Sequence, residues 1–329
     1  MTRRVAITGW GHAVPATAID NAFFEARIET TDEWIVERTG IRERRVAEPE
    51  ESTATLAATA ARRILGRAGV DPAQLDLIIL ATATPDQPVP QTAAFLADAL
   101  GVQCGAMDLG AGCAGFVYAL VVGAASVAGG AFDRVLVLGA ETLSRIVDPD
   151  DRSTVILFGD GAAGVLLEAR PDGPGFLAGD LGVDGSAADI LAVPAGGSRR
   201  PATAETVAQR EHYVRMQGQE VFRRAVRAVV ESSECALARA GVATSAVDWF
   251  VPHQANLRII EAARQRLGIP GERTIVNIER YGNTSAASIP LALSEAADAG
   301  RFGTGDTILL SGFGAGMSWA SAVLTWGAA

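Results

Sequence analysis

The sequence predicts an α/β fold built from two similar halves, in which helices lie between and around two sheets. Three observations carry this prediction: helix-like and strand-like segments alternate, the strand-like segments are almost wholly apolar, and segments of the first half recur in the second. Continuous apolar strands are typical of sheets covered on both faces. Two such sheets packed back to back give a layered α-β-α-β-α sandwich.

The recurring segments are the strongest of these observations. They pair at offsets of 172, 173 and 173 residues: LGRAGVDPAQLDLIIL (65–80) with LARAGVATSAVDWFVP (237–252), DRVLVLGA (133–140) with DTILLSGF (306–313), and CAGFVYAL (113–120) with AASIPLAL (286–293). One match between amphipathic segments arises by chance, but three at nearly one offset indicate a duplication. We therefore predict an N-terminal half at 1–172 and a C-terminal half at 173–329.

Within the first half, apolar patterning predicts alternating helices and strands, namely a helix over 55–68, a strand over 75–81, a helix over about 91–100, and strands near 105–108 and 134–139. Segments 155–158 and 163–168 are expected to form a closing antiparallel pair. The uncharged stretch from Leu109 to Phe132 is long enough to cross a bilayer. Its six glycines and flanking aspartates instead favour a helix buried between the sheets.

Composition excludes several classes of protein. The 28 Lys and Arg against 38 Asp and Glu give a net charge of −10, so no overall field would hold the chain on nucleic acid or an anionic membrane. The cysteines and histidines are few and widely spaced: Cys104, Cys113, Cys235, His12, His212 and His253. This spacing fits neither a disulfide framework nor a metal cluster. With no signal-peptide pattern at the N-terminus, we expect a cytoplasmic protein that binds no metal.

Cys113 is the candidate nucleophile. It follows a strand and a glycine-rich turn in DLGAGCAGF and stands at the start of the buried helix. The positive end of a helix dipole favours a thiolate, and small neighbours admit a substrate carbonyl. A buried structural cysteine is the alternative reading of this segment alone.

His253 and Asn283 are the other candidates. His253 follows the strand WFVP, and the carboxyl ends of strands are where α/β folds expose polar groups to ligands. Asn283, in YGNTSAAS, aligns within about three residues with Cys113 of the other half. An ordinary helix N-cap is the alternative reading for Asn283.

Together, Cys113 in GAGCAGF, His253 in VPHQANLRII and Asn283 in YGNTSAASIPLAL resemble the Cys, His and Asn of the β-ketoacyl-acyl-carrier-protein synthase III family, which has the thiolase-like fold. Similar segments run nearly end to end: TTDEWIVERTGIRERR (30–45), DRSTVILFGDGAAGVLL (151–167), QGQEVFRRAV (217–226) and SGFGAGMSW (311–319).

The resemblance implies a decarboxylative Claisen condensation without a cofactor. Cys113 would take an acyl group from acyl-CoA, with the backbone N–H groups of Cys113 and Ala315 as the oxyanion hole. Malonyl carrier protein would then lose CO₂, and neutral His253 and Asn283 would stabilise the enolate that attacks the acyl-cysteine. The product would be a 3-oxoacyl carrier protein that starts fatty-acid or polyketide synthesis.

The resemblance also implies the binding residues and a homodimer. Trp34 and Arg152 match the pair that holds the CoA adenine, Arg38 a phosphate contact and Asn256 a pantetheine contact. Val89 matches a position at the end of the acyl pocket where some members place Phe from the partner subunit, so primers longer than acetyl are expected. The carrier-protein patch would be Arg223, Arg258 and Arg266, and Arg223, Arg224 and Arg227 lie along one predicted helix as a cationic ridge.

Three alternatives stay open at this point. A starter-loading enzyme or acyltransferase of secondary metabolism would use the same three residues. A cysteine hydrolase shares the chain order Cys, His, Asn but has a different sequence around its cysteine. A non-catalytic binding protein would not need all three polar residues.

Overall fold

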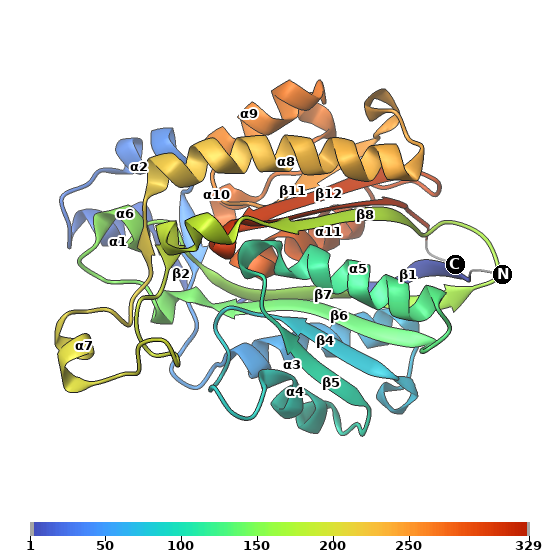
Figure 1. Cartoon of the computed structure of the whole chain (residues 1–329), viewed down its shortest axis with the longest axis horizontal. Helices are drawn as coiled ribbons and strands as arrows, with labels where there is room; N and C mark the ends of the chain where they lie inside the picture. The colour runs from blue at the N-terminus through green and yellow to red at the C-terminus, as the bar shows by residue number, and fades with distance from the viewer. Residues whose placement is uncertain (1–2, 328–329) are drawn as a thin grey trace.

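The computed structural model describes residues 3–327, and its two main sheets lie face to face with helices between them (Figure 1). The first sheet has this strand order: β1 (Arg4–Ala13), β7 (Asp160–Arg170), β6 (Arg134–Thr142), β4 (Leu77–Ala81) and β5 (Gly105–Leu109). The second sheet has this order: β8 (Phe176–Val183), β13 (Ser318–Thr325), β12 (Thr307–Gly314) and β11 (Trp249–Pro252). In each sheet the strands at the β5 or β11 end pair in parallel, and the strands toward β1 or β8 pair antiparallel.

The second sheet repeats the first. Strand β11 pairs parallel with β12 as β4 pairs with β6, and each pair continues into an antiparallel neighbour, β13 or β7. A single parallel bridge from Phe250 to Thr274 stands where β5 pairs with β4 in the first half. The duplicated α/β fold is therefore confirmed. The boundary at residue 172 falls between β7 and β8, and the two halves as separate domains stay a prediction.

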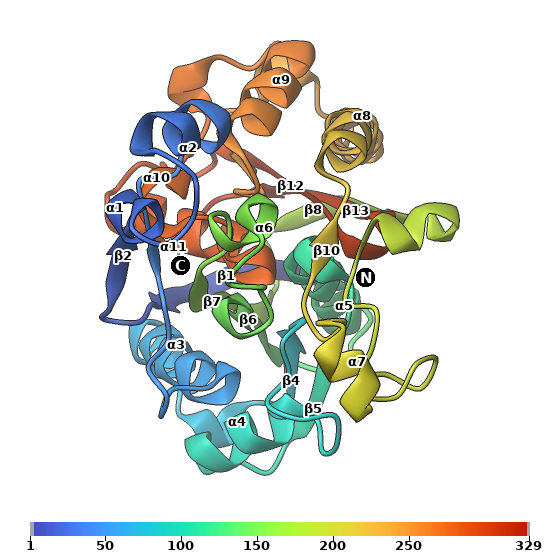
Figure 2. The ribbon, with the colours of Figure 1, turned by 90° about the vertical axis from the view of Figure 1, so that its left-hand side faces the viewer.

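Helices fill the middle layer and cover both outer faces (Figure 2). The middle layer holds α5 (Gly115–Ala128) and α11 (Ser288–Asp298), each of which contacts strands of both sheets. The first sheet is covered by α3 (Thr53–Ala68) and α4 (Thr92–Leu100), and the second by α8 (Gly218–Ala240) and α9 (Leu257–Leu267). The predicted buried helix is thus α5, whose Phe116, Val117 and Leu120 are fully enclosed.

Shorter elements border the end of the sheets where the chemistry-bearing residues gather (Figure 1). They are β2 (Ala18–Asp20), α1 (Asn21–Glu25), α2 (Asp32–Thr39), β3 (Glu43–Arg45), α6 (Arg152–Val155), β9 (Leu191–Ala192), α7 (Ala204–Ala208), β10 (Arg215–Met216) and α10 (Ile278–Tyr281). Among residues 3–327, no helix combines the length and apolar character that crossing a membrane requires.

Two details of the predicted elements differ from the structure. Helix α3 begins at Thr53 because the Ser52 side chain accepts a hydrogen bond from the backbone N–H of Thr55 and caps the helix. The predicted antiparallel pair of 155–158 with 163–168 is wrong. Asp151 instead caps the short helix α6, and 163–168 lies inside β7, which pairs with β1 and β6.

The contact between β6 and the turn before α11 sets a steric limit that can be tested. A Cβ added at Gly139 would lie 2.1 Å from the carbonyl oxygen of Ala286. We expect Gly139→Ala to lower the free energy of unfolding by roughly 3 kcal/mol, because Gly139 is held in β6 and Ala286 in the buried turn before α11. Chemical denaturation measures this value.

Gly66→Ala is the matched control. Gly66 lies in α3, where an added Cβ meets nothing within 4 Å. Replacing an unhindered helical glycine raises stability by about 1 kcal/mol. Equal stabilities for the two variants would contradict the proposed clash.

Candidate active site

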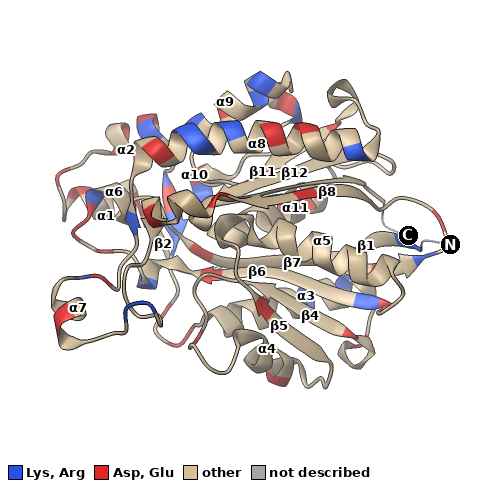
Figure 3. Cartoon of the chain, in the orientation of Figure 1, with Lys and Arg blue, Asp and Glu red and all other residues tan. Residues whose placement is uncertain are grey.

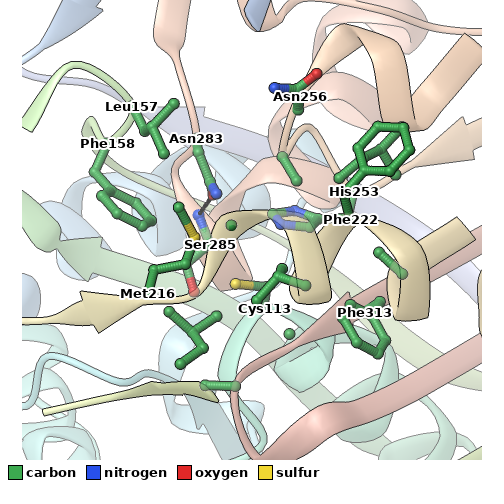
Figure 4. Close-up of a pocket in the computed structure, with 18 of the residues that line it drawn as sticks. Cys113, Leu157, Phe158, Met216, Phe222, His253, Asn256, Asn283, Ser285 and Phe313 are labelled. Carbon is green, nitrogen blue, oxygen red and sulfur yellow. Dashed lines mark hydrogen bonds between the residues drawn. The ribbon is translucent and has the colours of Figure 1, made fainter. Parts of the chain in front are cut away.

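A cavity of about 720 Å³ opens at the end of the two sheets and brings the three candidate residues together. Cys113 comes from the 3-10 turn Gly112–Ala114, His253 from the residue after β11, and Asn283 from the segment before α11. All three are buried and line the cavity. Figure 4 shows their side chains converging on one space, with apolar side chains such as Phe158, Phe222 and Phe313 around them.

The Cys113 thiol is protonated in the unloaded protein. Its pKa is raised to about 11, mainly by burial and also by the nearby charge of Glu141, against the lowering effects of Ser285 and of the amides of Ala315 and Cys113. The predicted thiolate is therefore wrong for the unloaded chain. Desolvation disfavours the charged form of a buried sulfur and so opposes the effect of the helix dipole.

His253 is neutral and oriented by Ser288. Burial lowers its pKa to about 3. Its Nδ1 lies 2.6 Å from the Ser288 hydroxyl, which also accepts the backbone N–H of Gln254 at 3.4 Å. The Ser288 hydroxyl can then donate its hydrogen bond to Nδ1. Because Nδ1 accepts this bond, the proton of the neutral imidazole lies on Nε2. A neutral ring with Nε2–H donates a hydrogen bond into the cavity.

Two hydrogen bonds hold Asn283 in place. Its Oδ1 accepts the backbone N–H of Ser285 at 2.8 Å (Figure 4). Its own backbone N–H donates to Leu157 at 2.8 Å, which ties the segment to the chain before β7. With Oδ1 occupied, the amide NH₂ is the group left for a ligand, so Asn283 and His253 offer two donors to one region.

Two backbone amides complete the site. The amides of Cys113 and Ala315, predicted for the oxyanion hole, both lower the pKa of the Cys113 thiol, against the effect of burial. The approach of β12 to the nucleophile requires a glycine, because a Cβ on Gly314 would lie 2.5 Å from the Cys113 nitrogen. Donors placed this close to the sulfur can hold the oxygen of a thioester that the sulfur attacks.

Of the predicted substrate-binding residues, Trp34, Arg38 and Asn256 line the cavity, whereas Arg152 lies beside Trp34 without lining it. The Arg152 guanidinium lies 4.8 Å and that of Arg38 5.3 Å from the Trp34 ring centre. No flat base fits between Trp34 and Arg152 at that distance, so an adenine could insert only after Arg152 moves. Asn256 caps α9 by accepting the Arg258 N–H at 2.8 Å and donates to the Arg38 carbonyl at 2.9 Å.

The arginines predicted to bind the carrier protein differ in whether acidic side chains of this chain pair with them. On α8, Arg223 pairs with Glu220 at 2.8 Å, Arg224 with Glu220 and Asp184, and Arg227 with Glu231 at 2.7 Å. The predicted cationic ridge is therefore largely neutralised by its own helix and by Asp184. Within residues 3–327, Arg258 and Arg266 on α9 form no ion pair. Helix α9 packs beside α8, along which basic and acidic residues alternate (Figure 3).

Val89 does not line the cavity of its own chain. It lies in the loop before α4 with 81% of its surface exposed. Among residues 3–327, no cluster of three or more His, Cys, Asp or Glu side chains could hold a metal ion.

Three polar residues of the site were missed by the sequence analysis: Glu141, Ser285 and Ser288. Glu141 is fully enclosed at the end of β6, and both serines lie in the turn and helix start after Asn283. A signal for Glu141 was available, because a single acidic residue ends the otherwise apolar run VLVLGAET. No sequence pattern distinguishes the two serines from ordinary residues at a helix start.

Comparisons with known proteins agree on one family. Residues 107–185 match the family model described as 3-oxoacyl-[acyl-carrier-protein] synthase III, and residues 237–326 match the model of its C-terminal part. The β-ketoacyl-[acyl-carrier-protein] synthase III of Roseiflexus castenholzii is 49% identical over 100% of both chains. That of Symbiobacterium thermophilum is 48% identical over 99% of both.

Solved structures give the same result. The β-ketoacyl-[acyl carrier protein] synthase III of Thermus thermophilus superposes with a TM-score of 0.91 at 46% identity, covering 98% of this chain and 100% of that one. The fold and these relatives define the class as thiolase-like acyltransferases. The chain belongs to the β-ketoacyl-[acyl-carrier-protein] synthase III family.

The neutral state of His253 can be tested directly. Because burial lowers its pKa to about 3, the imidazole nitrogen signals of His253 should stay constant between about pH 5 and 8. The measurement is an NMR titration of protein labelled with ¹⁵N-histidine, in which the His253 signals are those lost in His253→Asn. A midpoint near the ordinary value of about 6.5 would show that the ring is charged on the acid side of neutrality.

Proposed function

We propose that the chain is a β-ketoacyl-acyl-carrier-protein synthase III in which Cys113, His253 and Asn283 act together. The sulfur of Cys113 attacks the thioester of an acyl-CoA primer, and CoA leaves with the electrons of the broken carbon–sulfur bond. Malonyl carrier protein then loses CO₂, and the resulting enolate attacks the acyl-cysteine to give 3-oxoacyl carrier protein and free Cys113. The supporting observation is the convergence of these three side chains on one cavity.

Each stage has its own donors. During acyl transfer, the amides of Cys113 and Ala315 hold the carbonyl oxygen of the primer. During condensation, Nε2–H of His253 and the NH₂ of Asn283 hold the enolate oxygen. Neutral donors suit this stage, since they stabilise a developing negative charge without giving up a proton to it. These steps require no metal or redox cofactor, because no electron is exchanged with a carrier.

The binding roles are part of the same proposal. Trp34, Arg38 and Arg152 form an aromatic and cationic mouth suited to an adenine nucleotide, and Asn256 is positioned to meet a pantetheine arm below it. For the acidic carrier protein, Arg258 and Arg266 have the freer charges, and Arg223 contributes less because Glu220 pairs with it. The three free cysteines suit a reducing cytoplasm.

A second candidate function stays within the family. The priming β-ketosynthase of the R1128 polyketide pathway superposes with a TM-score of 0.91 at 36% identity, covering 99% of this chain and 97% of that one. A starter-loading enzyme of secondary metabolism, or an acyltransferase to oxygen or nitrogen, would share the acylation step and differ in the acceptor. Family membership leaves no support for a papain-like hydrolase or for a protein that only binds.

Intact mass spectrometry tests the central step. After incubation with a panel of acyl-CoAs, the wild-type chain should gain the mass of one acyl group. Cys113→Ser should lower the acylation rate by at least about 10³-fold, because a hydroxyl without an adjacent base is a poor nucleophile. Cys104→Ser and Cys235→Ser are the controls and should be acylated like the wild type.

Adding malonyl carrier protein separates the two candidate functions. A 3-oxoacyl carrier protein identifies the condensing enzyme, and acylation without that product identifies the acyltransferase. An unmodified wild-type chain would contradict both.

We also propose a homodimer built on strand β5. In the described chain β5 is the edge strand of its sheet, with β4 on one side only. Met107 on β5, Phe95 on α4 and Val122 on α5 are large apolar side chains that are more than a third exposed near this edge. An edge strand with exposed apolar neighbours can pair with a strand of another chain. In a two-fold symmetric dimer, β5 of one copy would pair with β5 of the other. The exposed Val89 would then reach the partner's acyl pocket.

Val89→Phe tests the pocket assignment. A larger side chain across the end of the pocket should lower acylation by primers longer than acetyl by about tenfold, with little effect on acetyl-CoA, because one or a few methylenes no longer fit. Light scattering on the same samples reports the oligomeric state. A monomeric wild type, or a strict preference for acetyl-CoA before the substitution, would overturn this part of the proposal.

A further inference from the structure

Arg44 is a buried arginine to which the proposed reaction gives no role. It lies on the short strand β3, and only 1% of its surface is exposed. Within residues 3–327 its guanidinium forms no ion pair, and its Nε has no hydrogen-bond partner. Burial lowers its pKa to about 10, so the group is charged at neutral pH. Because a buried charge without a paired carboxylate costs free energy, its presence indicates a use for the side chain.

The guanidinium joins two short helices. One Nη donates to Oδ1 of Asn21 at 2.8 Å, and the other donates to the carbonyl oxygen of Ile156. Asn21 is the first residue of α1, and Ile156 is the C-cap of α6. The guanidinium also lies 4.5 Å from the ring centre of Phe24 on α1, a contact that favours an enclosed cation. A planar fork of donors can hold both acceptors at once, whereas the point charge of an ammonium group cannot.

Asn21 extends this link to both ends of α2. Its side-chain NH₂ donates to Oδ1 of Asp32, the first residue of α2, at 2.7 Å. It also donates to the carbonyl of Ile41, two residues after α2 ends, at 2.9 Å. Asn21 is itself only 1% exposed. Arg44 and Asn21 therefore tie α2 to α6 through buried hydrogen bonds.

Helices α2 and α6 carry the two residues predicted to hold an adenine. Trp34 lies on α2, and Arg152 is the first residue of α6, with its guanidinium 4.8 Å from the Trp34 ring centre. Trp34 and Val155 pack against the same buried apolar cluster, which includes Ile156. The three helices α1, α2 and α6 lie together at one end of the molecule (Figure 1).

We propose that Arg44 is a positioning residue for the coenzyme, an inference that rests on the proposed function. With Asn21, it holds α2 and α6 at the spacing at which Trp34 and Arg152 receive an adenine. The helices stay in place, and the Arg152 side chain, which donates to the Glu29 carbonyl at 2.8 Å in the unloaded protein, turns away to admit the base. A mouth that is already ordered spends less free energy on binding, so the adenine contact contributes more to affinity.

The catalytic Asn283 should not depend on this link, although Ile156 is close to it in the chain. The next residue, Leu157, accepts the Asn283 N–H at 2.8 Å, and the Gly159 N–H donates to the Asn283 carbonyl at 3.0 Å. These bonds hold the segment without Arg44. Loss of the Arg44 fork should therefore weaken binding of CoA and spare malonyl carrier protein, whose pantetheine arm has no adenine.

Isothermal titration calorimetry with CoA is the first experiment. Arg44→Met keeps an unbranched side chain and removes the donors. The Kd for CoA should rise about tenfold, as expected for loss of an aromatic and cationic contact with the base.

Arg45→Met is the matched control, because it removes the same charge from the next position on β3. Arg45 donates to the Ala16 carbonyl at 3.2 Å and pairs with Glu43, and it contacts neither α2 nor α6. Its Kd for CoA should stay within about twofold of the wild type. An unchanged Kd in Arg44→Met, or an equal rise in Arg45→Met, would overturn the positioning role.

Steady-state kinetics is the second experiment. In Arg44→Met the KM for acyl-CoA should rise about tenfold, while kcat and the KM for malonyl carrier protein stay within about twofold. An acyl-pantetheine, which lacks the adenine, should have the same KM in both proteins. KM does not depend on the amount of folded enzyme, so a less stable variant still gives this comparison. Arg44→Lys should behave like Arg44→Met, because one ammonium group cannot hold both acceptors.

A merely structural role for Arg44 predicts another pattern. General loosening would lower thermal stability and raise the KM values for acyl-CoA, acyl-pantetheine and malonyl carrier protein alike, and that result would contradict the proposal.

The positioning role and the proposed function fail separately. A wild type that binds CoA more tightly than Arg44→Met but takes no acyl group overturns the proposed function alone. A wild type that is acylated and condenses normally, with the same Kd and KM in Arg44→Met, overturns the positioning role alone.

Discussion

The site depends on the contact between two short turns, Gly112–Ala114 and Ser285–Ala287, where the duplicated halves meet between the sheets. Each turn precedes a buried helix, α5 or α11. Small residues allow the approach: a Cβ on Gly115 would lie 3.1 Å from that of Ala81 and 3.6 Å from that of Ala286. Because each half delivers one turn to this point, a nucleophile from the first half and polar groups from the second share one cavity.

Enclosure then decides the protonation states. Desolvation raises the pKa of Cys113 to about 11 and lowers that of His253 to about 3, so both groups are neutral in the unloaded protein. A neutral imidazole is the form that can donate a hydrogen bond to an enolate. A neutral thiol, by contrast, must lose its proton as it reacts. The same burial that prepares one stage of the reaction therefore creates the need for a proton acceptor in the other.

The sequence was sufficient for the duplication, the layered fold and the three residues that meet in the cavity, because a repeat offset and short motifs are local patterns. It failed where distant segments decide the outcome. The thiolate prediction used the helix dipole, which is local, and omitted desolvation by the opposite half. The cationic ridge on α8 was wrong partly for a local reason, because Glu220 and Glu231 on the same helix pair with its arginines, and only the pairing of Arg224 with Asp184 depends on the fold. Segment 163–168 pairs with β1 and β6 rather than with segment 155–158, which is its neighbour in sequence.

Equivalent positions in the two halves have taken opposite roles around Cys113. Gly112 corresponds to Ser285, and Gly314 corresponds to Glu141, each at an offset of 173. A side chain at 314 would collide with Cys113, since even a Cβ would lie 2.5 Å from its nitrogen. Glu141 instead has a buried carboxylate that accepts the Ala83 N–H and the Thr84 hydroxyl. One side of the nucleophile therefore needs space, and the other holds a buried carboxylate. A symmetric ancestor could supply only one of these at both positions, and the divergence of two residue pairs is enough to supply both.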